Sequence, residues 1–188
     1  MLKTEQKKLL IKIARDSIAS ELFDSPLMLP AITDKELLEP RGAFVTLKIK
    51  GSLRGCIGTF VTNKPLIEVV SDMAIQAAFH DPRFKPLSPD EFKAIEIEIS
   101  VLSPLKEISS IEEIEVGTHG IYIIKGPYGG VLLPQVAVEY GWDRIQFLDQ
   151  TCIKAGLYPG CWKDPDTKIL IFSAEIFDET CNQSKGCQ

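Results

Sequence analysis

The sequence has few basic residues relative to acidic ones and no long apolar run. It carries 21 Lys and Arg against 26 Asp and Glu, a formal net charge of −5. Affinity for a phosphate backbone comes from Lys and Arg that displace counterions, so we expect no nucleic-acid partner. No run approaches the roughly 18 apolar residues that span a bilayer, so we expect no membrane partner either. Residues 1–12 alternate charged and apolar side chains, unlike a signal peptide, which predicts a cytoplasmic protein.

Cysteine is sparse and odd in number, with five residues spread over a chain of 188. A secreted disulfide framework is denser and usually even, so we expect reduced thiols. No Cys or His pair has the short spacing typical of zinc motifs, and we expect no metal site. The Cys-x-x-x-Cys-x-x-Cys spacing of a radical iron–sulfur enzyme is also absent. The cysteines are Cys56, Cys152, Cys161, Cys181 and Cys187.

The rest of the composition is that of a globular protein. Hydrophobic residues make up 45% and charged residues 25%. A chain of this length buries roughly 70% of the surface that its unfolded form exposes. There is no internal repeat, low-complexity tract or linker, so we expect a single domain over residues 1–180, followed by a disordered tail at 181–188.

Strand and helix patterns follow one another without regular β-α-β alternation. Strands are indicated by apolar and polar residues that alternate, and helices by apolar residues three and four apart between Pro or Gly. This order predicts an α+β fold, an antiparallel sheet with flanking helices. Helices are predicted from Thr4, after Pro65 and over Asp143–Gly156, and strands over Gly42–Lys50, Leu53–Thr59, Ile95–Val101, Ile121–Lys125, Val131–Val136 and Lys168–Phe177.

The most unusual segment is Leu53-Arg54-Gly55-Cys56-Ile57-Gly58. If the strand is regular, Arg54 and Cys56 project from the same face. A nearby positive charge lowers the pKa of a thiol, so this pairing predicts a reactive cysteine. Gly55 and Gly58 would let a ligand approach the backbone. The alternative is a small buried cysteine in a tightly packed hairpin, whose glycines serve a bulge or close packing.

A turn at Pro82 follows the long central helix and could present His80 and Arg83 outward. A histidine at a helix end is also favoured by the helix dipole alone, which is the structural alternative for His80. Asp81 with Arg83 is most simply interpreted as an ion pair that ties loops together, and Gln135 as an amide with the same purpose.

The hexapeptide Leu53–Gly58 resembles the hallmark of the AMMECR domain family. Further matching segments follow in family order and, with it, cover roughly residues 40–177, which is too many for coincidence. They are Gly42–Leu47, Ala77–Phe84, Ile97–Ser103, His119-Gly120, Leu132–Ala137, Gly141–Asp143 and Lys154–Leu157.

The resemblance implies a compact α+β protein of two unequal lobes, and we expect the smaller one around residues 40–100. It implies association with a Memo-type protein and a radical S-adenosylmethionine protein. It brings no settled activity, and we expect no cofactor. It also places His119 on a family motif, which makes this residue a better functional candidate than His80. The alternative role for His119 is to cap a loop by hydrogen bonding.

Two functions therefore remain open. The first is an accessory component whose cleft at Arg54 and Cys56 binds an unknown small molecule or docks a partner. The second is a thiol-dependent enzyme with Cys56 as nucleophile or redox residue, Arg54 as its activator or anion site, and His119 or His80 as general base. We favour the first, because the second requires side chains to converge in space. The ligand-binding candidates are Arg54, Gly55, Cys56, Gly58, His80, Arg83 and Gln135.

Overall fold

The structure, a computed structural model, describes residues 1–179. The chain divides into two units. Unit 1 comprises Met1–Leu102 and the C-terminal residues from Glu175, and unit 2 comprises Ser103–Ala174. The smaller lobe expected around residues 40–100 is not the division found, because those residues lie in unit 1. The tail expected at 181–188, with Cys181 and Cys187, lies outside the described residues.

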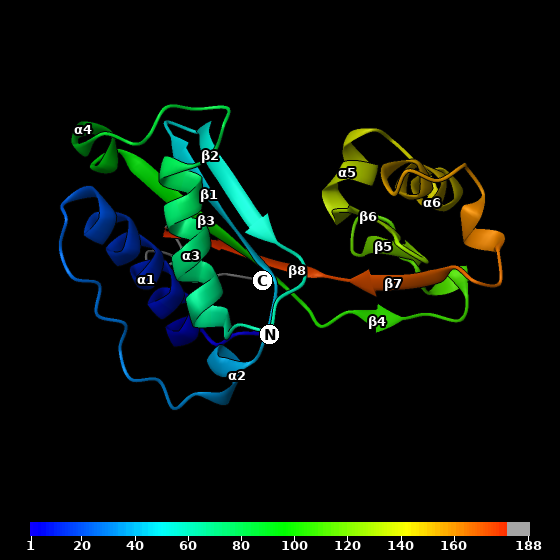
Figure 1. The fold of residues 1–188 in the computed structure, drawn as a ribbon, viewed down its shortest axis with the longest axis horizontal. Coiled ribbons are helices and arrows are strands. Elements are labelled where there is room, and N and C mark those ends of the chain that lie inside the picture. The colour runs from blue at the N-terminus through cyan, green and yellow to red at the C-terminus, as the bar shows by residue number, and fades with distance from the viewer. Residues whose placement is uncertain (180–188) are drawn as a thin grey trace. The chain divides into compact units, whose positions relative to one another are not determined.

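Unit 1 is built on a four-stranded sheet with the strand order β2-β1-β3-β8 (Figure 1). Its strands are β1 (Ala43–Ile49), β2 (Ser52–Thr59), β3 (Ile95–Leu102) and β8 (Ala174–Asp178). β1 pairs antiparallel with β2 and with β3, which confirms these three predicted strands and the antiparallel sheet. β2 is an edge strand, so one row of its peptide groups faces away from the sheet.

Two long helices, α1 (Thr4–Leu22) and α3 (Leu66–Phe79), cover one face of this sheet, as predicted. Two short helices, α2 (Lys35–Leu38) and α4 (Pro89–Phe92), were not predicted. Each aliphatic side chain buried between the helices and the sheet contributes about 1.5–3 kcal/mol. Among residues 1–179, no helix is both long and apolar enough to cross a bilayer. The core includes Leu10, Ala14, Ile18, Val45, Leu47, Val70, Ala74, Ala77, Ile97 and Ile99.

Unit 2 contains a second four-stranded sheet, in the order β4-β7-β5-β6. Helix α6 confirms the helix predicted over Asp143–Gly156 and begins at a capping box, in which Asp143 accepts from the Gln146 N–H and Gln146 accepts from the Asp143 N–H. Its elements are β4 (Lys106–Glu107), η1 (Ile111–Glu113), β5 (Gly120–Lys125), β6 (Tyr128–Leu132), α5 (Pro134–Glu139), α6 (Arg144–Lys154), η2 (Cys161–Lys163) and β7 (Lys168–Phe172).

Two strand predictions need correction. The single strand expected over Lys168–Phe177 is interrupted at Ser173, where the backbone exchanges hydrogen bonds with Ser103, so that β7 and β8 belong to different sheets. The strand expected over Val131–Val136 ends at Leu132. Pro134 begins α5 instead, because a first helical residue does not need its N–H.

The expectation that all cysteines are reduced is wrong for one pair. Cys152 of α6 and Cys161 of η2 form a disulfide, with Cα atoms 6.0 Å apart. Both are fully buried in unit 2. Glycines at 156 and 160, with φ of 77° and 86°, reverse the chain between them. The spacing of nine residues alone does not reveal this turn.

Loss of this disulfide should destabilise unit 2. The closed loop is short, so we expect the double variant Cys152→Ser/Cys161→Ser to lose about 2 kcal/mol of its free energy of unfolding. Urea denaturation of the two proteins, with and without reductant, measures this difference. Reductant should destabilise only the wild type, and equal sensitivity in the double variant would contradict the assignment.

Candidate binding site

Edge strand β2 is not regular where the hexapeptide begins. Leu47 of β1 pairs with Gly55, but the next residue, Lys48, pairs with Leu53. Arg54 is therefore an extra residue without a partner on β1, which makes it a β-bulge. An extra residue interrupts the alternation of side chains between the two faces of a strand. The strand is therefore not regular here, and the expectation that Arg54 and Cys56 share one face does not hold.

Arg54 and Cys56 accordingly engage different groups. Cys56 lies opposite Thr46 of β1, whose Oγ1 donates a hydrogen bond to Sγ at 3.2 Å. The thiol is partly buried. The Arg54 guanidinium instead binds Glu91 of α4. Its positive charge is thus paired with a carboxylate, which removes the reason for expecting Arg54 to activate the thiol.

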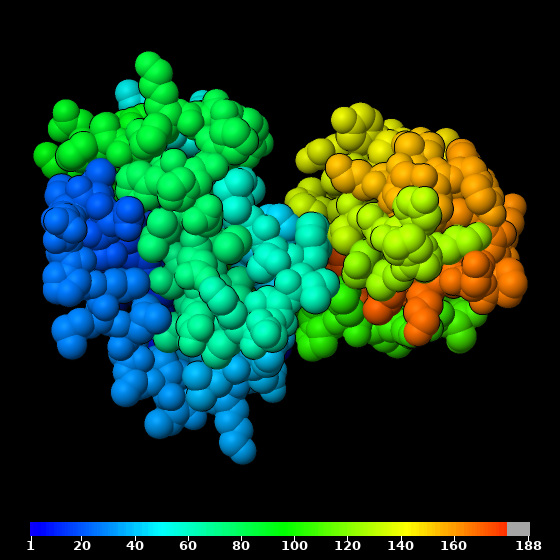
Figure 2. Space-filling view, in the orientation of Figure 1, coloured from blue at the N-terminus to red at the C-terminus, as the bar shows by residue number. Residues whose placement is uncertain are grey.

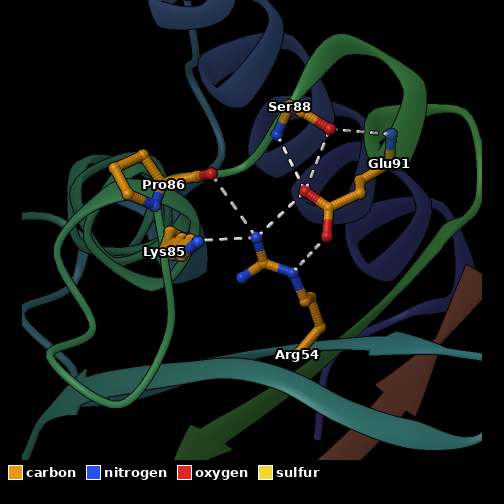
Figure 3. Close-up of polar contacts among 5 residues, drawn as sticks. All are labelled: Arg54, Lys85, Pro86, Ser88 and Glu91. Carbon is orange, nitrogen blue, oxygen red and sulfur yellow. Dashed lines mark hydrogen bonds and ion pairs between the residues drawn. The ribbon is translucent and has the colours of Figure 1, made fainter.

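The Arg54–Glu91 pair is bidentate and well anchored (Figure 3). Nε donates to Oε1 at 2.7 Å and Nη2 to Oε2 at 3.0 Å, while Nη2 also donates to the Lys85 carbonyl at 2.9 Å. Ser88 donates to Glu91 from both its N–H and its hydroxyl, each at 3.0 Å. Two parallel charge-assisted hydrogen bonds fix orientation as well as energy. The pair therefore ties the start of β2 to the segment that leads into α4.

Acid should break this pair. Hydrogen bonds from Arg54 and Ser88 lower the pKa of the Glu91 carboxyl from 4.5 to about 2. Because the folded-state pKa is the lower one, the stabilisation is complete above about pH 4.5 and is lost as the pH falls toward 2. We expect the free energy of unfolding of Glu91→Gln to fall less steeply than that of the wild type between pH 5 and pH 2.

Urea denaturation at a series of pH values checks this expectation. The matched control is Asp90→Asn, which changes the exposed neighbouring carboxylate of the same helix and should keep the wild-type slope. Parallel pH profiles for Glu91→Gln and the wild type would contradict the role of the pair.

A second ion pair closes the outer edge of β2 at Cys56. Asp81 is buried, with 1% of its side chain exposed, and accepts the Cys56 N–H at 2.9 Å. It also accepts Arg83 Nε at 2.9 Å and Nη2 at 2.6 Å. Arg83 Nη2 in turn donates to the Cys56 carbonyl at 3.1 Å. Both peptide groups of Cys56 are thus bonded, and we call this arrangement the Asp81–Arg83 clamp.

The clamp has a clear electrostatic signature. Hydrogen bonds from Arg83 and from the Cys56 N–H hold the pKa of the Asp81 carboxyl far below its usual value, although burial opposes this shift. The same hydrogen bond raises the pKa of Arg83. The predicted ion pair between these two residues is confirmed. The ring of Phe84 has the guanidinium carbons of Arg83 and Arg54 at 5.5 and 5.8 Å from its centroid.

The peptide groups of Gly58 are open, in contrast to those of Cys56. The outward Cys56 N–H shows that Cys56 and Thr46 form a non-hydrogen-bonded pair, and such pairs alternate along an antiparallel ladder. Gly58, paired with Phe44 two residues on, therefore also directs its N–H and C=O away from β1. Within residues 1–179, no group bonds to these atoms.

The two glycines of the hexapeptide serve close packing. A Cβ at position 55 would lie 2.2 Å from the Ala77 carbonyl oxygen of α3. A Cβ at position 58 would lie 2.2 Å from the Phe44 ring. The packing alternative therefore describes both glycines, and Gly58 has in addition an open peptide edge.

A groove lies beside this open edge. It has a volume of about 520 Å³, and residues of β2 and α3 form its walls. Both elements contribute to the face of the molecule drawn in Figure 2. We call it the edge groove. Its lining residues are Ile57, Gly58, Thr59, Asp72, Met73, Ile75 and Gln76.

The remaining candidates lie elsewhere. His80 is the exposed C-cap of α3 and directly precedes Asp81 of the clamp. In unit 2, His119 accepts the Glu115 N–H on Nδ1 at 3.1 Å, which is the loop-cap role. Gln135 is exposed on α5, also in unit 2. Among the described residues, no three His, Cys, Asp or Glu side chains are placed to hold a metal ion.

Two residues of the site escaped prediction. Glu91 forms a capping box with Ser88, and the Ser-x-x-Glu pattern was available as a signal. Thr46 carried no signal beyond its place on a strand. The Ser-x-x-Glu pattern does not show that the Glu91 carboxylate would bind Arg54, because that contact joins segments 37 residues apart.

Comparison with known proteins gives consistent matches. A sequence model of the AMMECR1 family matches residues 11–177. A protein from Thermococcus kodakarensis is 44% identical over an alignment of 189 positions, which covers 95% of this chain and 92% of that relative. One from Methanopyrus kandleri is 44% identical over 184 residues, covering 93% and 89%. A crystal structure of an uncharacterized protein from Pyrococcus horikoshii matches with a TM-score of 0.75 and 43% identity, covering 90% and 89%.

Proposed function

The chain belongs to the AMMECR1 family, and we propose that it acts as a binding component, which holds a ligand or partner at the Cys56 segment. The observation that carries this proposal is the state of the polar groups around Cys56. Asp81 and Arg83 bond both of its peptide groups, and Glu91 holds the Arg54 guanidinium. A segment held in this way is a rigid scaffold with one open edge at Gly58.

The thiol-dependent enzyme is the second candidate, and it rests on the partial exposure of Cys56. Catalysis by a thiol requires a base or a free cation beside the sulfur. The Thr46 hydroxyl is the group that donates to Sγ. Arg54 is bonded to Glu91, the Arg83 guanidinium beside Cys56 is paired with Asp81, and His119 Nδ1 accepts a backbone N–H. These contacts favour binding over nucleophilic catalysis.

We propose as partners the Memo-type protein and the radical S-adenosylmethionine protein that family resemblance suggests, acting in the cytoplasm. Each partner, purified, would be titrated into the wild type and into Cys56→Ser, with the heat of binding as the readout. Serine is nearly the size of cysteine, so the binding proposal predicts the same affinity for both proteins within about twofold.

Binding that is lost in Cys56→Ser, while the variant remains folded, would favour a chemical role for the thiol. Absence of binding by the wild type to either partner would contradict these two as the partners.

An alkylation assay resolved by mass spectrometry complements the titration. If Arg54 does not activate the thiol, Arg54→Ala should leave the alkylation rate of folded Cys56 within about threefold of that of the wild type.

A further inference from the structure

We infer, on the basis of the proposed binding function, that the edge groove receives an extended polypeptide segment that ends in a free carboxylate and pairs with β2 as an added strand. The backbone carries the first step. Gly58 presents an unbonded N–H and C=O at the edge of the sheet, and a strand-like segment satisfies such groups with its own main chain.

The clamp determines where an added strand can pair. Asp81 and Arg83 occupy the hydrogen-bonding groups of Cys56, so pairing cannot extend past this residue toward the start of β2. The open stretch therefore begins at Gly58. A short segment that terminates beside Cys56 fits this edge, whereas a long strand that runs through it does not.

The groove supplies a place for the side chains of that segment. Successive side chains of a strand point to opposite faces, so every second residue of an added strand would face α3. Ile57, Met73 and Ile75 provide apolar surface there. The volume of about 520 Å³ lies within the range of roughly 300–1,000 Å³ found for ligand pockets. An aliphatic or aromatic side chain near the end of the segment fits this chemistry.

Charge sets the direction of the segment. Arg83 marks the end of the edge at Cys56, and 53% of its side chain is exposed. Its bonds to Asp81 and Cys56 use Nε and Nη2, and within residues 1–179 no hydrogen bond uses Nη1. Guanidinium groups bind carboxylates well. A C-terminal carboxylate at Arg83 makes the segment antiparallel to β2.

At the opposite end of the groove both members of an ion pair are exposed, so neither sign of charge dominates. Asp72 lies there and pairs with Lys64 at 2.6 Å. The exposed His80 caps α3 at the Arg83 end and carries a ring N–H that can donate a hydrogen bond. At the Arg83 end, by contrast, the carboxylate of Asp81 is buried and the guanidinium is exposed, so the exposed charge there is positive, which favours one orientation of the bound segment.

Synthetic peptides test this inference. The probes are N-acetylated heptapeptides with the last four positions randomised, made once with free carboxylates and once as C-terminal amides. We expect the best carboxylate sequences to bind at least about tenfold more tightly than the same sequences as amides. Binding should shift the amide NMR resonance of Gly58. Equal affinity of acids and amides, or no binding from either set, would overturn the inference.

A groove variant supplies the control for location. Gln76→Trp places a large ring in the edge groove and should weaken peptide binding at least about tenfold. Lys12→Trp adds the same ring at an exposed position of α1 and should leave binding unchanged. Peptide binding that is indifferent to Gln76→Trp would overturn the inference. If no peptide binds while a full-length partner does, only this inference fails. If neither binds, the proposed function fails as well.

Discussion

Gly55→Ala should lower the free energy of unfolding by about 3 kcal/mol, at the upper end of the range for overpacking a protein interior. The added Cβ would lie 2.2 Å from the Ala77 carbonyl oxygen and 3.2 Å from its carbonyl carbon. Both atoms belong to the backbone of α3, so no side-chain rotation relieves the overlap. The helix would have to move away from the sheet and give up part of the contacts that form the core of unit 1.

The matched control is a second glycine of the same hairpin. Gly51 has a φ of 77°, and a Cβ added there would meet no atom within 4 Å. Asn tolerates this backbone conformation best after Gly. We expect Gly51→Asn to cost about 1 kcal/mol or less. Urea denaturation of the three proteins compares the costs. If both substitutions cost the same, close packing by α3 does not explain the glycine of the hexapeptide.

Asp81→Ala should lower the free energy of unfolding by about 3 kcal/mol, near the lower limit for breaking a buried ion pair. The carboxylate accepts backbone hydrogen bonds from Cys56 and Arg83, and it binds the Arg83 side chain through Nε and Nη2. Removing it leaves the Cys56 N–H without its acceptor. Half of the Arg83 side chain is exposed and can be hydrated, which keeps the cost at the lower limit.

Two further variants separate charge from shape. Asp90→Ala removes an exposed carboxylate nearby and should cost less than about 0.5 kcal/mol. Asp81→Asn keeps the size of the side chain but loses its charge, so its cost should fall between those of the other two variants. The prediction fails if Asp81→Ala is as stable as Asp90→Ala.

Much of the fold could be predicted because local patterns follow its elements. The alternation of Ile95–Val101 marks β3, and Pro65 and Pro82 bracket α3. The break at Ser173 could not be predicted, since it depends on which sheet each half of the segment joins. The disulfide escaped for the same reason, because the turn between its cysteines is not visible in their spacing.

The contacts of the candidate residues could be predicted only in part from the sequence. The hexapeptide, with Asp81 and Arg83, forms one cluster in unit 1. The expected partnership of Arg54 with the thiol is wrong, because a one-residue bulge has no clear signature in the sequence. The prediction that Arg54 activates the Cys56 thiol required a regular strand, and edge strands such as β2 often contain bulges.

An activated thiol at Cys56 and a binding edge at Gly58 predict opposite effects of two substitutions. If the thiol were the working group, changes at Cys56 would abolish function and changes in the groove would matter little. With a binding edge, Cys56→Ser is tolerated and Gln76→Trp is not. The two variants lie on neighbouring elements, so their contrast is informative without reference to any particular ligand.

Hydrogen exchange at two backbone amides tests the closed and open parts of the β2 edge most directly. We predict that the Cys56 amide, bonded to buried Asp81, exchanges at least about a hundredfold more slowly than that of Gly58. In Asp81→Ala, the Cys56 amide should exchange as fast as the Gly58 amide. Equal exchange rates for the two amides in the wild type, measured by NMR, would contradict the clamp and the open edge together.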